Sequence, residues 1–360
     1  MTSEINIVAP INQLGYGVAG LNILKSLSSI TKVALWPIGQ PQVVKQEDAQ
    51  VVSEAIKRAR RPDFSAPCIK IWHQDDMSQF SGKGLRIGFP IFELDEFNDL
   101  EKHHLSSLDK IFVCSQWAKE IMLNAIDINK EEVYVIPLGV DRNIFKPIEK
   151  DTNDKTVFFN CGKWEVRKGH DILVTAFNEA FDKNDNVELW MMCENPFFSE
   201  SEQLEWIGLY KNSKLGEKIR IIGRVETQEE VYNIMSQTDC GVFPSRGEGW
   251  NLELLEMMSC GKIVIATNCS AHTEFCNTDN CILIEPGEKE VAYDGKWFHG
   301  KCGSWASMGG EQVKNISTAM AKVHHANSKA ATLNTYGIDT ASNYSWSHSA
   351  SHIMKALKNV

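Results

Sequence analysis

The sequence predicts an α/β protein with two doubly wound, parallel-sheet domains. Short apolar strands alternate with amphipathic helical stretches, and this alternation starts again after a connector that contains proline and charged residues near residue 145. The length of 360 residues also fits two domains of ordinary size. We therefore expect one domain over residues 1–145, a second over 146–344 and a terminal helix over 345–360.

Each expected element follows from a short sequence run. The strands expected in the first domain are INIVAP, KVALWP, CIKIW, LRIGFPIF, KIFVCS and VYVIPL, and the helices between them include VAGLNILKSLSSI, EDAQVVSEAIKRARR and SQWAKEIMLNAI. The strands expected in the second are TVFFNC, VELWMMC, IRIIG, CGVFPS, KIVIAT and CILIEP, with helices near 169–182, 228–237 and 252–260. Ligands of open parallel sheets bind at the carboxyl ends of strands, so the loops there are the candidate site.

Composition excludes several functional classes. The formal net charge is −10, of which residues 1–150 carry −2 and the remainder −8, so nonspecific nucleic-acid binding is not favoured. No run approaches the roughly 20 apolar residues of a membrane helix. The N-terminus MTSEINIVAP lacks the lysines and apolar core of a secretory signal, and we expect a cytoplasmic protein. The ten cysteines show no CxxC pair, and only Cys276, Cys281 and Cys302 are grouped in a way that suggests a metal.

Two glycine-containing loops follow strands. NQLGYGVAG places Gly15 and Gly17 before a helix, where they serve either a phosphate contact or simply a tight turn. NCGKWEVRKGHD is the stronger candidate, because Lys163 leaves one strand and Lys168 precedes the next helix, so both cations can converge on a diphosphate. Arg167 either joins them or points to water.

The stretch RGEGWNLELLEMMSCG carries two carboxylates eight positions apart. Glu248 lies between glycines in the loop, and Asn251 is a good N-cap for a helix that begins at Leu252. Glu256 lies in the apolar run LLEMM, where a bare carboxylate costs several kcal/mol unless it is hydrogen-bonded. A ribose diol can supply two such bonds. The alternative is that Glu253 and Glu256 share a wet helix face.

Together these motifs resemble the retaining glycosyltransferases of family 4, which have two Rossmann-like domains in the arrangement called GT-B, with a cleft between them. The resemblance is strongest over 111–276: VCSQWAKE leads to VIPLGVDRNIFKP, Gly162, Lys163, Lys168 and Gly169 match the G-R-x5-K-G element with lysine for arginine, and PSRGEGWNLELLE matches the paired-glutamate element.

The resemblance implies a role for each motif residue. Glu256 would hold the nucleotide ribose, Glu248 would contact the donor sugar, and Lys163 and Lys168 would neutralise the diphosphate. The remaining donor-binding candidates are Gly15, Gly17, Gly249, Trp250, Asn251 and Leu252. The family needs neither a metal nor another cofactor.

Two positions depart from the family pattern. Many members carry a histidine where this chain has Phe92 and Glu93, so Glu93 is a catalytic candidate, and His73 is a possible substitute. Trp250 and Asn251 stand where phenylalanine and glycine are frequent. Trp250 serves packing or sugar stacking.

The expected function is retaining transfer of a hexose or pentose from a nucleotide sugar, expected to be a UDP-sugar, to an acceptor hydroxyl. The default acceptor is a surface glycan. Bacteriophage-type glycosylation of a modified DNA base is an alternative, for which the basic cluster Lys57, Arg58, Arg60 and Arg61 would hold the polyanion unless it is only a solvated helix end. A sugar-nucleotide epimerase of the same fold is a further alternative. The intact lysines and glutamates argue against a catalytically silent module, and no feature suggests the pyridoxal lysine of a phosphorylase.

Overall fold

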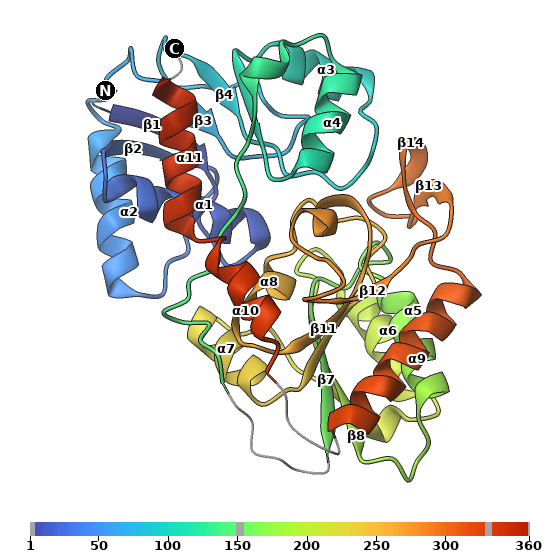
Figure 1. Ribbon diagram of the computed structural model, residues 1–360. Coiled ribbons are helices and arrows are strands. Elements are labelled where there is room, and N and C mark those ends of the chain that lie inside the picture. The colour runs from blue at the N-terminus through green and yellow to red at the C-terminus, as the bar shows by residue number, and fades with distance from the viewer. Residues whose placement is uncertain (1–3, 149–154, 328–332, 359–360) are drawn as a thin grey trace. The chain divides into compact units, whose positions relative to one another are not determined.

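The computed structural model describes residues 4–148, 155–327 and 333–358. It divides into two compact units, Met1–Gly139 with Tyr344–Val360 (unit 1) and Val140–Asn343 (unit 2). Each unit contains a six-stranded parallel sheet (Figure 1), in agreement with the predicted fold class. The first division falls a few residues before the expected boundary at 145.

Unit 1 has the strand order β2-β1-β3-β4-β5-β6. Its strands are β1 (Glu4–Ala9), β2 (Lys32–Pro37), β3 (Cys68–Lys70), β4 (Arg86–Gly88), β5 (Lys110–Val113) and β6 (Val133–Val135). Its helices are α1 (Gly15–Ser28), α2 (Gln46–Arg58), α3 (Asp99–Ser106), α4 (Gln116–Ala125), the 3-10 turn η1 (Lys130–Glu132) and α11 (Trp346–Lys358). Strand β4 is shorter than the run LRIGFPIF suggests, and Pro90 has no N–H to extend the ladder.

Unit 2 has the strand order β12-β11-β10-β7-β8-β9 and a separate antiparallel hairpin. Its strands are β7 (Thr156–Gly162), β8 (Val187–Cys193), β9 (Ile219–Ile221), β10 (Cys240–Phe243), β11 (Ile263–Thr267), β12 (Ile282–Ile284), β13 (Lys289–Tyr293) and β14 (His299–Ala306). Its helices are α5 (His170–Ala180), α6 (Glu200–Lys211), α7 (Gln228–Ser236), α8 (Leu252–Ser259), α9 (Gly310–Asn327) and α10 (Thr335–Ser342), with 3-10 turns η2 (Gly216–Lys218) and η3 (Ser270–Glu274).

The helices of unit 2 cover both faces of its sheet. In Figure 1, α5, α6 and α9 lie on one face and α7, α8 and α10 on the other. The core combines strand residues such as Phe158 and Leu189 with Leu173 and Phe177 of α5, all fully buried. The loops at the carboxyl ends of β7, β8 and β10 are therefore carried by a rigid, close-packed body.

Several elements of unit 2 were not expected from the sequence. The hairpin β13–β14 and the helices α6, α9 and α10 follow no run identified above. Helix α6 shows why: Leu204 and Leu209 are exposed while Tyr210 is buried, so its apolar residues form no single stripe.

The terminal helix α11 belongs to unit 1 and lies along α1 (Figure 1). The Oγ of Ser349 donates a hydrogen bond to the carbonyl of Pro137 at 2.6 Å. A Cβ placed on Gly139 would stand 2.2 Å from the backbone nitrogen of Trp346. The entry into α11 therefore depends on a glycine at position 139.

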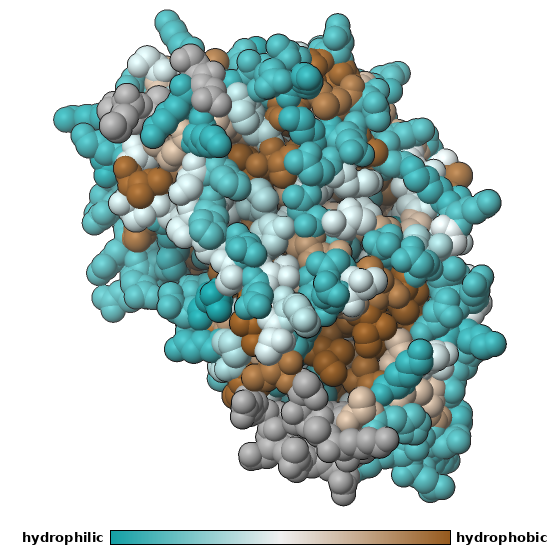
Figure 2. All heavy atoms as spheres, in the orientation of Figure 1, coloured by the Kyte–Doolittle hydropathy of each residue, from teal (hydrophilic) through white to brown (hydrophobic). Residues whose placement is uncertain are grey.

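Hydrophilic side chains cover much of the face shown in Figure 2, and hydrophobic residues are visible between them in patches. Among the helices of the described residues, none is long and apolar enough to cross a membrane.

Gly139→Ala should lower the free energy of unfolding by about 1–3 kcal/mol, since the added methyl overpacks the contact with the start of α11. Thermal denaturation followed by circular dichroism measures the change. Gly208→Ala is the matched control, because Gly208 is in α6, a Cβ there meets only the Asn212 side chain at 3.5 Å, and alanine favours the helix. Equal melting temperatures for Gly139→Ala and the wild type would contradict the close approach.

Candidate functional site

The β7–α5 loop begins and ends at glycines in the left-handed region, Gly162 at φ 145° and Gly169 at φ 72°. A Cβ at Gly169 would stand 2.1 Å from the carbonyl oxygen of Pro244, so only glycine fits there. This close approach brings the β7–α5 loop against the β10–α8 loop. The two segments that the sequence singled out therefore meet at the carboxyl edge of the sheet.

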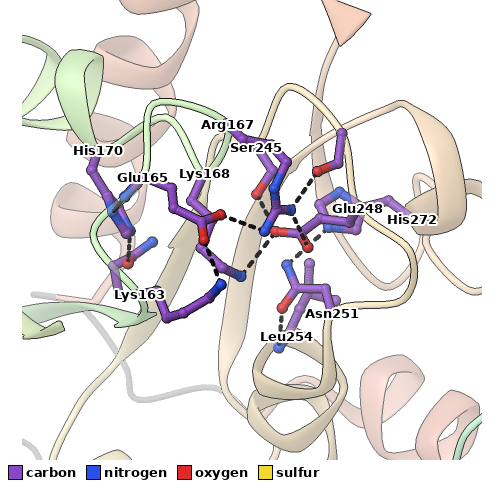
Figure 3. Close-up of polar contacts among 12 residues, drawn as sticks. Lys163, Glu165, Arg167, Lys168, His170, Ser245, Glu248, Asn251, Leu254 and His272 are labelled. Carbon is purple, nitrogen blue, oxygen red and sulfur yellow. Dashed lines mark hydrogen bonds and ion pairs between the residues drawn. The ribbon is translucent and has the colours of Figure 1, made fainter. Parts of the chain in front are cut away.

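Glu248 joins these two loops electrostatically (Figure 3). Its Oε2 accepts from Nη1 of Arg167 at 2.9 Å, and its Oε1 accepts from Nζ of Lys168 at 3.0 Å and from Oγ of Ser245 at 2.8 Å. Burial alone would raise the pKa of Glu248, but the Lys168 and Arg167 cations hold it well below its usual range. Glu248 is therefore a buried, charged carboxylate with two cationic partners.

The network continues through Glu165. Its Oε2 pairs with Nη2 of Arg167 at 2.6 Å and its Oε1 with Nζ of Lys163 at 2.7 Å. Although burial works in the opposite direction, the Arg167 and Lys163 cations lower the pKa of Glu165 to about 2. Three cations and two carboxylates therefore leave one net positive charge, and Lys163, with 34% of its side chain exposed, is the cation most open to a ligand.

Arg167 and Glu165 are site residues that the sequence reasoning did not assign. The sequence allows Arg167 either a site role or a position that faces water. In the structure Arg167 is 4% exposed and lies within the ion-pair network. The segment KWEVRK could have indicated these roles, because Lys163, Glu165 and Arg167 alternate in charge within a short loop, and such alternation is typical of paired charges.

His170 fixes the backbone of the β7–α5 loop, which carries Lys163 and Lys168, through two hydrogen bonds. Its Nδ1 accepts from the backbone N–H of Glu165 at 3.2 Å, which leaves Nε2 to donate to Oδ1 of Asn160 at 2.9 Å. Burial, followed by the charge of Lys168, lowers the pKa of His170 to about 3. A neutral histidine therefore fixes the backbone between Lys163 and Lys168.

Asn251 caps helix α8 in a left-handed conformation, at φ 82° and ψ 79°. Its Oδ1 accepts from the N–H of Leu254 at 3.1 Å, and its Nδ2 lies 2.9 Å from Nε2 of His272. His272 Nδ1 is 2.9 Å from the carbonyl of Thr267, so the tautomer that donates there leaves Nε2 to accept from Asn251. The backbone conformation explains why glycine suits this position in the family that the motif resembles.

Glu256 is buried in α8 with 6% exposure, and no hydrogen bond or ion pair to its carboxyl group is found within the described residues. Burial, followed by the charge of Glu253, raises the pKa of Glu256 well above its ordinary value. The interpretation that Glu253 and Glu256 share a wet face is wrong for Glu256. Burial raises the pKa of the Cys161 thiol at the end of β7, and the nearby charges of Glu253 and Glu256 raise it further, whereas that of Lys168 lowers it.

Trp250 packs in the interior. It is 2% exposed, and its ring lies 5.0 Å from that of Phe275. Gly249 and Leu252 flank the segment that leads from Trp250 and Asn251 into α8. Cys276 and Cys281 are buried, and within the described residues no three His, Cys, Asp or Glu side chains are grouped to hold a metal ion.

Four of the predicted residues, Gly15, Gly17, His73 and Glu93, lie around Tyr16 at the carboxyl ends of the unit 1 strands. The Tyr16 hydroxyl donates to the Ile91 carbonyl at 2.7 Å, its ring centroid lies 4.7 Å from that of His73, and burial followed by the charge of Glu93 raises its pKa. A Cβ on Gly17 would lie 2.2 Å from Oδ1 of Asn12, whereas one on Gly15 meets nothing within 4 Å. Gly17 is therefore required by the turn itself, whatever it binds.

The basic cluster Lys57, Arg58, Arg60 and Arg61 lies near the amino ends of the unit 1 strands. Lys57 and Arg58 end α2, which leads to the amino end of β3, and Arg60 and Arg61 are exposed. The following loop reaches the amino end of β1, where Asp63 N–H donates to Oε1 of Glu4 at 2.8 Å. Lys57, Arg58, Arg60 and Arg61 therefore lie at the opposite end of the unit 1 strands from Gly15, His73 and Glu93. Their role in holding a polyanionic acceptor stays a prediction.

Unit 2 contains the part of the chain that matches a known protein family. Residues 155–294 match the model of the family described as glycosyl transferases group 1. The phosphatidylinositol N-acetylglucosaminyltransferase GPI3 subunit of Saccharomyces cerevisiae is 24% identical over 217 residues, which cover 56% of this chain and 47% of that protein. The chain thus spans about half the length of this curated relative.

Solved structures resemble the whole chain. Anabaena HepE in complex with UDP-glucose has a TM-score of 0.72 at 15% identity, covering 99% of this chain and 100% of that one. Sucrose-phosphate synthase from Thermosynechococcus elongatus has a TM-score of 0.71 at 15% identity, covering 99% and 98%. Residues 155–294 of this chain are thus similar to the glycosyl transferases group 1 family, and the chain as a whole has the predicted GT-B fold.

Proposed function

We propose that this protein is a retaining glycosyltransferase that transfers a sugar from a nucleotide sugar, most simply a UDP-sugar, to a hydroxyl of a glycan without a metal ion. One observation carries the proposal: Glu256 is a buried carboxyl with no hydrogen-bond or ion-pair partner among the described residues, on the helix that follows the Glu248 loop, and that loop is ion-paired with the loop of the three cations. A ribose diol can donate two hydrogen bonds to it, and a diphosphate suits the cations.

In this proposal Lys163 meets the leaving diphosphate first, because it is the most exposed of the three cations. Lys168 and Arg167 lie behind it, anchored on Glu248. Cleavage of the anomeric bond leaves negative charge on the diphosphate, and cations that are already in place stabilise that charge without reorganisation. The α8 N-terminus, near Asn251 and Leu252, adds the favourable end of a helix dipole.

Retention of configuration requires the acceptor to attack from the face that the leaving group vacates. A leaving phosphate oxygen can then take the acceptor proton, so the reaction needs no protein base at that position. Glu248 has its carboxylate oxygens engaged by Arg167, Lys168 and Ser245, which supports a role in holding the cations. Its contact with the donor sugar stays a prediction. Gly15, His73 and Glu93 of unit 1 are proposed to contribute to the acceptor side.

The test starts with binding and follows with turnover. UDP, GDP and ADP are titrated by calorimetry, and the corresponding sugar nucleotides are then incubated with the protein and candidate glycans. Transfer that retains the anomeric configuration, seen by NMR, supports the proposal. Epimerised donor formed without any acceptor would indicate the epimerase, and transfer to hydroxymethylated DNA would indicate the phage-type reaction.

Glu256→Gln should stabilise the free protein at neutral pH and weaken its response to UDP. Because the folded-state pKa of Glu256 is raised, the folded state holds a proton that the unfolded state loses above pH ~4.5. This group therefore costs stability as the pH rises from about 4.5 toward its folded pKa, and glutamine removes that cost. Each pKa unit is worth about 1.4 kcal/mol.

Melting temperatures at pH 4 and pH 7.5, with and without UDP, measure both effects. The mutant should gain a few degrees at pH 7.5, nearly nothing at pH 4, and lose most of the shift that UDP produces in the wild type. Glu253→Gln is the matched control for UDP binding, since Glu253 is only partly buried on the same helix and should keep the UDP shift. Because its charge contributes to the raised pKa of Glu256, this control should show a smaller gain at pH 7.5 than Glu256→Gln. A Glu256→Gln protein with wild-type UDP affinity would remove the ribose contact from the proposal.

Lys163→Ala should lower the turnover of donor hydrolysis by about 10²–10³-fold with little change in stability, since it removes ~2.7–4 kcal/mol of leaving-group stabilisation from an accessible position. Lys168→Ala should lower both turnover and melting temperature, because it leaves the buried carboxylate of Glu248 with one cation fewer. Release of UDP from the UDP-sugar is the readout.

The control for charge alone is Lys214→Ala, an exposed lysine of unit 2 paired with Asp182. It should leave turnover within twofold of the wild type. EDTA should also leave turnover unchanged in all four proteins. Strong inhibition by EDTA, reversed by a divalent cation, would overturn the metal-independent part of the proposal.

A further inference from the structure

Two exposed aromatic side chains of unit 2 lie beside Lys163. Phe197, which follows β8, is 54% exposed, and Trp297, in the turn of the β13–β14 hairpin, is 44% exposed. Their rings meet edge to face with centroids 5.8 Å apart, and Nζ of Lys163 lies 5.6 Å from the Phe197 centroid. We call this pair, Phe197 and Trp297, the aromatic shelf.

The shelf is held in a fixed conformation. Oδ1 of Asp294 accepts from the backbone N–H groups of Lys296, Trp297 and Phe298 at 2.9, 2.7 and 2.8 Å. Lys296 also forms an ion pair with Glu202 of α6. A ring on a preformed turn loses little conformational entropy when a ligand packs against it.

The hairpin that carries Trp297 is also tied to the Glu248 loop. Trp305 donates from Nε1 to Oε1 of Glu290 at 3.0 Å, and Nε of Arg246 lies 3.4 Å from the same oxygen. Arg246 in turn makes two 2.8 Å hydrogen bonds to the Asp171 carboxylate of α5. Polar contacts therefore connect the hairpin that carries Trp297 to the loop of the proposed site.

The shelf lies next to Lys163, the proposed diphosphate contact, but not on the helix that carries the proposed ribose contact. Phe197 leads into α6, on the face of the sheet opposite to α8, which carries Glu256 (Figure 1). A donor held by Glu256 through its ribose and by Lys163 through its diphosphate leaves the shelf for a different group, next to the leaving group.

The charge around the shelf indicates what that group is. Residues 196–202 and 288–301, together with Lys163, contain five acidic and four basic residues, so the shelf has no net positive charge around it that would attract a nucleic acid or an anionic membrane. The face of an aromatic ring is the negative end of its quadrupole and attracts polarised C–H groups such as those on one face of a sugar ring.

We propose that Phe197 and Trp297 form a subsite for a neutral sugar ring of an oligosaccharide acceptor. The inference rests on the proposed function and deepens it, because it makes the acceptor a glycan of at least two sugars, one of which stacks on the shelf while another presents the hydroxyl.

The test uses UDP-saturated full-length protein on an array of neutral and anionic oligosaccharides, and the strongest neutral binder is then titrated by calorimetry. Trp297→Ala should raise its Kd by at least about tenfold, as expected for loss of one stacking contact. Trp297→Phe should restore much of the affinity. Tyr336→Ala, which removes an exposed aromatic residue of α10, is the matched control and should stay within twofold of the wild type.

UDP affinity, measured in the same proteins, separates the two proposals. If the wild type binds UDP but no neutral oligosaccharide, or if Trp297→Ala binds the oligosaccharide as the wild type does, the subsite is wrong and the proposed function stands. If Trp297→Ala loses only cosedimentation with vesicles of phosphatidylcholine and phosphatidylglycerol, the shelf is a membrane contact. If UDP does not bind to the wild type, both proposals fall.

Discussion

The contact of Glu248 with Arg167 and Lys168 is the interaction on which the site of unit 2 depends. It joins the loops that follow β7 and β10, neighbouring strands of the sheet, and the close approach of Gly169 to Pro244 makes it possible. A buried carboxylate with two cations is stable only if the geometry is maintained, because loss of either partner leaves an uncompensated charge. Electrostatics and backbone packing therefore specify the same arrangement of the two loops.

Much of this arrangement is readable in the sequence. The parallel sheets follow from strand and helix alternation, and the strands TVFFNC and CGVFPS became β7 and β10, so their following loops had to meet at one edge. The burial of Glu256 followed from its apolar neighbours Leu255 and Met257. These inferences succeed because they depend on local pattern and on the direction of strands.

Other features depend on long-range partners and were not readable. Arg167 is buried because Glu165 and Glu248 both reach it, which no local pattern specifies. The sequence of the β13–β14 hairpin gives a weak strand signal, because its apolar residues Val291 and Tyr293 face water. The hairpin is held through the contact of Glu290 with Arg246, which is far away in the sequence. The position of the basic cluster, at the opposite end of the unit 1 strands from Gly15, His73 and Glu93, was also not readable, because composition alone does not say at which end of a sheet a helix stops.

The ion pairs among Lys163, Glu165, Arg167, Lys168 and Glu248 also bear on selectivity. Three unpaired cations would attract inorganic phosphate and any other small anion. Here most of that charge is already balanced by carboxylates of the chain itself, so an incoming anion gains only the excess and must compete with Glu165 for Lys163. A ligand that brings additional hydroxyl groups for a carboxyl such as Glu256 can offset this competition, whereas bare phosphate cannot. The acidic side chains of the free protein thus disfavour the binding of anions that offer charge alone.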